Sequence, residues 1–170
     1  STGLIDAIEP YVSNVVTTYM DVKQSYWIKL TPKTGSKMHK IRRYDDRDRK
    51  KVIELWKVCK LVRPWNDPDK DLDRKNKTGK NLFLILELDG KIIGSIMGGY
   101  DGHRGVINYL AVEPTYRGNG FGKMLVGAVE KKLKKLGCAK INLLVRSDNI
   151  DVEKFYKGIN YHKQEDVYVF

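Results

Sequence analysis

The chain has 170 residues, of which 41% are hydrophobic and 31% charged, which suits one globular domain and argues against disorder throughout. The net charge of +11 at pH 7 would suit an anionic partner, but the basic residues are scattered, so we favour a solvated, lysine-rich surface. Two cysteines without a CxxC pair or a Cys/His cluster argue against a disulfide framework and against a metal site.

Two further absences narrow the class of protein. The sequence has no run of about 18 or more apolar residues that could form a transmembrane helix. It has no basic-then-apolar leader either. We therefore expect a cytoplasmic protein that does not bind a membrane. No motif of interleaved aromatic and basic residues supports specific binding to nucleic acid, so we expect none.

The first 37 residues differ in pattern from the rest. Apolar residues between positions 4 and 16 have roughly helical spacing, although Pro10 interrupts it, and residues 22–30 are rich in β-formers. A turn-like stretch then leads to Met38. We therefore divide the chain into an N-terminal appendage, residues 1–37, and one domain, residues 38–170. The appendage could be an arm that binds a partner, an arm that supplies a strand to another subunit, or sequence foreign to the natural protein.

From residue 38 the sequence alternates between strand-like and helix-like patterns. Asp89-Gly90 is typical of a two-residue hairpin turn, and Gly137 is a natural helix end. The order of elements predicts a mixed α/β or α+β sandwich. The predicted elements are strand 39–43, a helix from Asp45 or Asp46 to Cys59, helix 69–77 with Pro68 in its first turn, strands 81–88, 91–100 and 106–112, helix 120–136, strand 140–145, helix 152–158, and one or two strands within 161–170.

A glycine-rich segment separates the third strand of the meander from the long helix. Gly118, Gly120 and Gly122 follow Arg117, and Lys123 comes next. Glycines let backbone N–H groups crowd together at the positive end of a helix, which makes a receptor for phosphate or pyrophosphate. The segment has no Gly-Lys-Ser/Thr ending and no G-x-G-x-x-G spacing, so it is neither a P-loop nor a Rossmann loop. It matches the pattern R/Q-x-x-G-x-G/A.

With this motif, residues 38–170, about four-fifths of the chain, resemble the GCN5-related N-acetyltransferases, the GNAT family. Within the family, the segments LVRPWNDP at 61–68 and MGGYDGHRG at 97–105 are most similar to small bacterial enzymes of the YpeA type. The resemblance implies a central, mostly antiparallel, splayed sheet flanked by helices. It also implies acetyl-CoA as cosubstrate and no metal.

The resemblance further implies roles for the strand and the loop. The backbone of Leu110, Ala111 and Val112 would bind the pantetheine arm and the acetyl carbonyl. An amine would attack the thioester directly, and a backbone N–H of the strand, that of Leu110 or Ala111, would stabilise the oxyanion. The residues that would hold the pyrophosphate are Arg117, Gly118, Asn119, Gly120, Phe121, Gly122 and Lys123.

A second match to the family lies near the C-terminus. Many members read roughly V-R-x-x-N and then F-Y, which correspond here to Val145, Arg146 and Asn149 and to Phe155-Tyr156. The resemblance implies that Asn149 contacts the cofactor arm and that Tyr156 protonates the leaving thiolate as general acid. The alternative for Tyr156 is a packing residue on a short helix.

Two positions depart from the family pattern. Asn160 replaces the usual glycine before the last aromatic, which is a mild change because asparagine tolerates left-handed φ. Leu144 stands where the ribosomal-protein alanine N-acetyltransferases have a glutamate base, so a direct base is missing there. The amine must lose its proton to another group or to a water chain. Candidate bases or substrate ligands are Glu87, Tyr100, Asp101, His103, Tyr109 and Glu113.

Four residues are candidates for contact with the acceptor. Trp65 and Asp67 lie in the connection between the first two helices, where an aromatic beside carboxylates suits a cationic amine. Their alternative roles are a tryptophan that pins the loop and an aspartate that caps the next helix. Tyr100 and His103 lie at the end of a strand and in the following turn, where an exposed histidine with no ligand is the commoner case.

The leading function is therefore an N-acetyltransferase that moves acetyl from acetyl-CoA to a primary amine of a small molecule or peptide. The alternative is a non-catalytic CoA-binding or interaction module, which the missing glutamate keeps open. The sequence does not determine the oligomeric state, for which a homodimer is one candidate. Because the predicted elements after Met38 are complete, we expect residues 38–170 alone to fold and to bind CoA.

Overall fold

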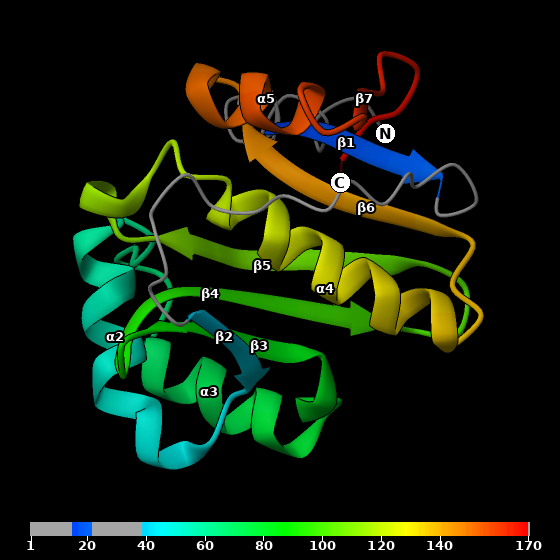
Figure 1. The fold of residues 1–170 in the computed structure, drawn as a ribbon. Helices are drawn as coiled ribbons and strands as arrows, with labels where there is room; N and C mark the ends of the chain where they lie inside the picture. Colours follow the sequence, from blue (N-terminus) through cyan, green and yellow to red (C-terminus); the bar gives the residue numbers. More distant parts are fainter. Residues whose placement is uncertain (1–14, 22–38, 170) are drawn as a thin grey trace.

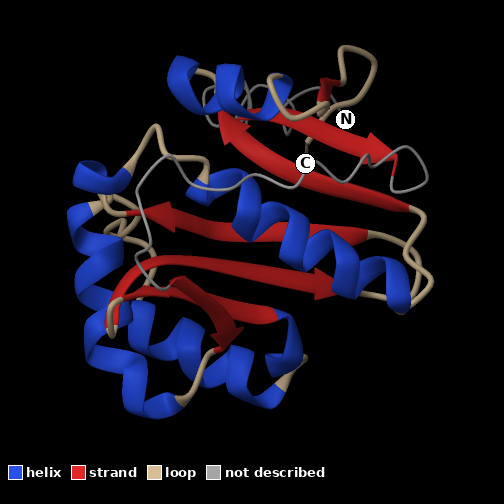
Figure 2. Cartoon of the chain, in the orientation of Figure 1, coloured by secondary structure: helices blue, strands red, loops and turns tan. Residues whose placement is uncertain are grey.

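Seven strands form one mixed sheet with helices on both of its faces (Figure 1; Figure 2). The computed structural model describes residues 15–21 and 39–169, and the sheet lies within these residues. Adjacent strands are antiparallel except β5 and β6, which are parallel. In spatial order the strands are β2 (His39–Arg43), β3 (Phe83–Leu88), β4 (Lys91–Tyr100), β5 (Gly105–Val112), β6 (Lys140–Arg146), β1 (Val15–Asp21) and β7 (His162–Lys163).

The helices divide between the two faces and bury one apolar cluster on each (Figure 1). Helices α4 (Phe121–Lys135) and α5 (Ile150–Lys157) cover one face, and α2 (Arg49–Val58) and α3 (Pro68–Lys77) cover the other. None of the helices in the described part of the chain is long and apolar enough to cross a membrane. This arrangement confirms the predicted mixed α/β class with a mostly antiparallel sheet flanked by helices.

Helix α4 packs unusually close to β4 because the strand carries glycines beneath it. A Cβ atom at Gly94 would lie 2.9 Å from a methyl carbon of Leu125, and one at Gly98 would lie 2.8 Å from a methyl carbon of Val129. Side chains at either position would push the helix away from the sheet. The residues that α4 buries against the sheet recur at helical spacing: Phe121, Leu125, Val126, Val129 and Leu133.

The far edge of the sheet contains a strand that the sequence did not predict. Of the one or two strands predicted within residues 161–170, the described residues contain one, β7, which is only His162–Lys163. The strand next to β6 is β1, which pairs with it over seven residues, from Val15↔Arg146 to Asp21↔Lys140. Residues 15 and 16, which have helical spacing with positions 4–12, therefore begin a strand, because the open edge of β6 offers its backbone groups to a partner. Residues 1–14 and 22–38, including the β-rich stretch 22–30, lie outside the described residues.

Candidate active site

Strands β5 and β6 are paired at one end and diverge at the other (Figure 1). Their register contains three pairs, of which the last is Ile107↔Leu143. Both strands continue beyond this pair, β5 to Val112 and β6 to Arg146. From residue 108 onward, all register partners that β5 has among the described residues therefore lie on β4. Its other edge presents backbone donors and acceptors that a ligand can bind.

A β-bulge interrupts β5 where the two strands begin to diverge. Tyr109 and Leu110 together stand opposite Ile96 of β4, because the register shifts between Met97↔Asn108 and Ser95↔Ala111. Tyr109 has a φ of 49°, in the left-handed region that bulky residues rarely occupy. Such a conformation costs about 1–3 kcal/mol and persists only where neighbouring groups hold it.

Buried side chains hold the bulge from the α2 face. The indole Nε1–H of Trp56 donates to Ser95 Oγ at 2.9 Å, and the Ser95 hydroxyl donates to the carbonyl oxygen of Tyr109 at 3.2 Å. The ring of Tyr109 stacks on that of Trp56 with centroids 4.0 Å apart. Its hydroxyl donates to Asp71 Oδ2 at 2.5 Å, and burial together with this carboxylate raises the pKa of Tyr109.

From the sequence alone, no role in the site was assigned to Trp56 or to Ser95. Both side chains are fully buried, and Trp56 is a core residue that also makes a hydrogen bond. The sequence feature that could have pointed to Ser95 is its hydroxyl, which stands alone in the apolar run from Ile92 to Met97. A buried hydroxyl needs a partner, so this serine predicted a hydrogen bond without indicating which group would make it.

The glycine-rich segment forms a tight loop at the start of α4, immediately after β5. Gly118 and Gly120 have φ values of 78° and 81°, in the left-handed region that favours glycine. The first backbone bond of the helix runs from the Met124 amide to the Gly120 carbonyl. Among the described residues, no backbone hydrogen bond of a turn, loop or cap is donated by amides 118–123. Six successive N–H groups are therefore available to an anion.

Two side chains of the loop stabilise its own backbone. Arg117 donates from Nε–H to the carbonyl oxygen of Val112 at 3.0 Å, and Asn119 donates from its amide to the carbonyl oxygen of Tyr116 at 3.1 Å. The Val112 carbonyl also accepts from the thiol of Cys59 at 3.4 Å. Lys123 lies half-buried in the first turn of α4. Direct contact of Arg117, Asn119 and Lys123 with a cofactor stays a prediction.

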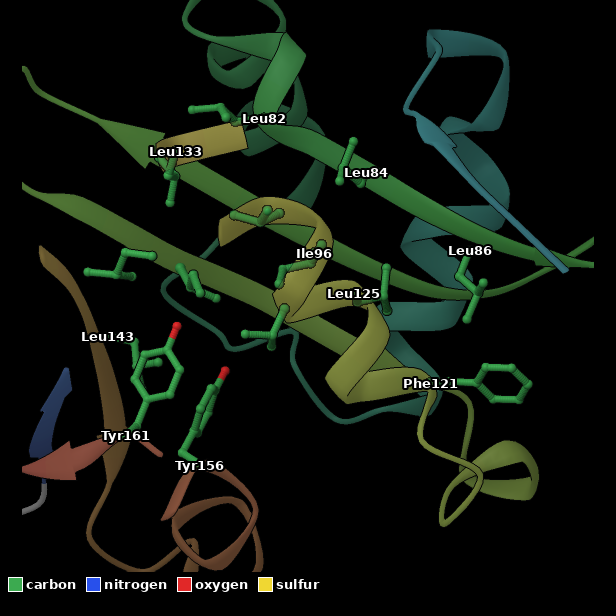
Figure 3. Close-up of a cluster of buried hydrophobic side chains, with 14 of the residues drawn as sticks. Leu82, Leu84, Leu86, Ile96, Phe121, Leu125, Leu133, Leu143, Tyr156 and Tyr161 are labelled. Atoms are coloured by element: carbon green, nitrogen blue, oxygen red, sulfur yellow. The ribbon is translucent and has the colours of Figure 1, made fainter. Parts of the chain in front are cut away.

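Helix α5 brings Tyr156 to the same buried cluster that Leu110 and Val112 contact. Tyr156 is 4% exposed, and its hydroxyl points into the cluster beside that of Tyr161 (Figure 3). The Tyr161 hydroxyl donates to Glu130 Oε1 at 3.0 Å, whereas no hydrogen bond of the Tyr156 hydroxyl occurs within the described residues. Burial raises the pKa of Tyr156, so it keeps its proton at neutral pH.

Helix α5 packs against the first turn of α4 and is preceded by a residue with an amide side chain. A Cβ atom at Gly122 would lie 3.1 Å from the ring of Phe155, so α4 and α5 meet closely there. Asn149 occupies the N-cap position of α5, is exposed, and makes no capping hydrogen bond with its side chain. Its amide is therefore not engaged by the helix that it precedes.

The four residues predicted to contact the acceptor substrate do not lie together at the β5 bulge. Asp67 caps α3 by accepting from the amides of Asp69 and Lys70, and Trp65 is 71% exposed. Tyr100 and His103 lie at the turn between β4 and β5, at the paired end of β5. Asp101 shapes this turn by accepting from the amides of His103 and Arg104.

An open groove of about 670 Å³ lies on the sheet face opposite α4. Its floor includes Val106 of β5 and Leu144 of β6, and Leu144 is 58% exposed. Tyr100 lines the groove, but His103 does not. Leu144 therefore faces this groove and brings no ionisable group to it. No group of three or more His, Cys, Asp or Glu side chains that could hold a metal ion occurs in the residues that the structure describes.

A mixed sheet that diverges beside a glycine loop at a helix start defines an acyltransferase fold, and comparisons with known proteins agree. The model of the Acetyltransferase (GNAT) family matches residues 49–161, so the chain belongs to this family. An acetyltransferase of Sodalis glossinidius is 50% identical over 125 residues, which are 74% of this chain and 87% of the relative. The expected family, fold and enzyme class are thus confirmed.

Solved structures show the same fold. The GCN5-related N-acetyltransferase of Sphaerobacter thermophilus has a TM-score of 0.74 at 18% identity, covering 96% of this chain and 54% of that one. An aminoglycoside N-acetyltransferase solved in complex with CoA has a TM-score of 0.66 at 19% identity, covering 83% of this chain and 97% of that one. At such identities the likeness concerns the fold alone.

Proposed function

We propose that the chain transfers an acetyl group from acetyl-CoA to a primary amine by direct attack of the amine on the thioester. The observation that carries the proposal is two runs of unpaired backbone groups that follow each other along the chain. The first lies on the edge of β5 beyond Ile107, and the second is formed by the six amides of the glycine loop. An extended ligand with amide groups at one end and a diphosphate at the other fits this succession.

The donor would bind along this backbone. The pantetheine arm carries amide groups that can pair with Leu110, Ala111 and Val112 as an added strand would. The pyrophosphate would accept from amides 118–123 at the start of α4, with Arg117 and Lys123 nearby to balance its charge. The side-chain amide of Asn149, which leaves α5 uncapped, would contact the arm from the opposite side.

The chemistry requires one nucleophile and two proton transfers. The amine nitrogen attacks the thioester carbon, and negative charge on the carbonyl oxygen is stabilised by the Leu110 or Ala111 N–H. The carbon–sulfur bond then breaks, and Tyr156 gives its proton to the leaving sulfur. A buried hydroxyl without a hydrogen bond among the described residues supports this role, because leaving such a group unpaired is costly in a core. The attacking amine loses its proton to water.

The test is thiol release from acetyl-CoA with a panel of amines, including aminoglycosides and short peptides. We expect release that depends on the amine. Tyr156→Phe should lower kcat by roughly 100-fold with little change in CoA affinity, because the ring packing remains. The matched control is Tyr161→Phe, which removes a hydroxyl of the same cluster that is already paired with Glu130. It should reduce stability and leave kcat nearly unchanged.

One observation favours a second candidate, a non-catalytic CoA-binding module. Leu144 is exposed in the groove on the sheet face opposite α4, where a carboxylate could have served as base. The same assay separates the two functions. Binding of acetyl-CoA without turnover on any amine, unchanged by Tyr156→Phe, would show that the chain binds the donor but does not catalyse transfer.

A further inference from the structure

One peptide group of the β5 bulge is held by a relay of buried hydrogen bonds. Trp56 donates to Ser95, and Ser95 donates to the carbonyl oxygen of Tyr109. The serine hydroxyl thus accepts one hydrogen bond and donates another, so it acts both as acceptor and as donor. The relay connects α2, across β4, to the point at which β5 leaves its regular pairing.

The direction of the Tyr109 carbonyl determines the direction of the next amide. The peptide group between Tyr109 and Leu110 is planar, and no cis peptide bond occurs in the described residues. In a trans peptide the C=O and the following N–H point in opposite directions. The Tyr109 carbonyl points toward the Ser95 hydroxyl, so the Leu110 N–H points away from Ser95. The edge of β5 that has no register partner at this residue is the one on the β6 side.

Regular strand pairing does not fix this peptide group. Neither Tyr109 nor Leu110 has a register partner on β4 or β6. The left-handed φ of Tyr109 would relax if the group were released. Stacking on Trp56 and the bond to Asp71 hold the tyrosine ring, and Asp71 is itself paired with Arg74 at 2.8 Å. The Ser95 hydroxyl holds the carbonyl.

We propose that Ser95, oriented by Trp56, is a positioning residue that aims the Leu110 N–H at the carbonyl oxygen of the bound thioester. The inference rests on the proposed function, because it presupposes that an acetyl group lies at the diverging edge of β5. Ser95 itself touches no substrate, since it is fully buried on the α2 side of the sheet. It acts through the orientation of one peptide group.

The test compares Ser95→Ala with the rescue variant Ser95→Thr, which keeps a hydroxyl. The decisive measurement is the infrared stretch of acetyl-CoA labelled with ¹³C at the carbonyl, because a hydrogen bond to this oxygen lowers the frequency. We expect the wild type and Ser95→Thr to lower it relative to free acetyl-CoA. Ser95→Ala should lose most of the shift and about tenfold or more in kcat, while its affinity for CoA, which has no acetyl group, should change little.

The outcomes separate the inference from the function on which it rests. A shift in Ser95→Ala as large as that of the wild type would overturn the positioning role, as would equal losses of CoA and acetyl-CoA binding. A wild type that transfers acetyl without any shift would overturn it as well and leave the function intact. A wild type that binds no acetyl-CoA would refute both. If Ser95→Ala does not fold, Trp56→Phe removes the donor to Ser95, and the same measurement decides.

Discussion

Tyr156 and Tyr161 show how two similar side chains in one apolar cluster come to differ in chemistry. Their rings pack edge to face with centroids 5.3 Å apart, and both hydroxyls point into the cluster (Figure 3). The Tyr161 hydroxyl donates a hydrogen bond to the buried carboxyl of Glu130. The Tyr156 hydroxyl makes no such hydrogen bond within the described residues, so it is available to a ligand.

Glu130 gives the fold a pH dependence of definite sign. Burial raises the pKa of its carboxyl, although the hydrogen bond from Tyr161 opposes this. Because the folded pKa lies above the unfolded one, this group's stabilising contribution is complete below the unfolded pKa and is lost as pH rises through the folded pKa. Glu130→Gln keeps an acceptor for Tyr161 and removes the charge.

We therefore expect Glu130→Gln to be more stable than the wild type at pH 8, with the difference shrinking toward pH 5. Urea unfolding at several pH values measures it, and the difference between the two curves isolates Glu130 from the other carboxyls. Glu54→Gln, which removes an exposed carboxylate, controls for the loss of one charge. A difference that grows toward acid pH would contradict the expectation.

At the scale of elements, the proposed function makes the glycine loop and α4 act together as an anion receptor. Gly118 needs a left-handed φ, and so does Gly102 in the turn between β4 and β5. A Cβ atom at either position would meet nothing within 4 Å. The two glycines therefore form a matched pair with the same backbone strain, one in the candidate site and the other at the opposite end of β5.

Gly118→Ala should weaken CoA binding by about tenfold or more, because a strained residue turns the loop amides away from the pyrophosphate. Gly102→Ala should cost a similar 1–2 kcal/mol or so of stability and leave the affinity unchanged. Titration calorimetry with CoA and thermal unfolding of both variants measure the two effects. Equal affinities in the two variants would show that the loop does not hold the donor.

Local patterns predicted α4 and its glycine loop, because helix periodicity and a Gly-rich start are encoded in adjacent residues. They did not predict the bulge at Tyr109, which depends on contacts with Ser95 and Trp56 from elsewhere in the chain. They also missed β1, whose partner β6 lies more than a hundred residues further along the sequence. Pairing between strands is set by tertiary contacts, which spacing alone does not reveal.

For the whole molecule, β1 comes from outside the region that matches the family, residues 49–161. The diverging strands, the glycine loop and α5 all lie after residue 38. Removing residues 1–37 would therefore leave the candidate site in place and expose the outer edge of β6. An uncovered edge of this length is prone to pair with another chain.

We expect the fragment 38–170 to fold and to bind CoA almost as tightly as the full chain, but to melt at a lower temperature and to associate as its concentration rises. Calorimetry and light scattering at two concentrations measure this. Thr18→Pro in the full chain is the companion variant, because it breaks the β1 ladder without shortening the protein. A fragment that is insoluble, or that melts like the full chain, would contradict the expectation.

The short parallel contact between β5 and β6 has a consequence for the rigidity of the sheet. Three register pairs join the part that contains β2 to β5 with the part that contains β6, β1 and β7, and the side-chain cluster under α4 and α5 packs across the same junction. A donor seated at this junction would bond to β5 on one side and to α5 on the other. On the proposed function, bound acetyl-CoA would thus link the two parts of the sheet across the junction. The enzyme would be most rigid while it holds the acetyl group that it transfers.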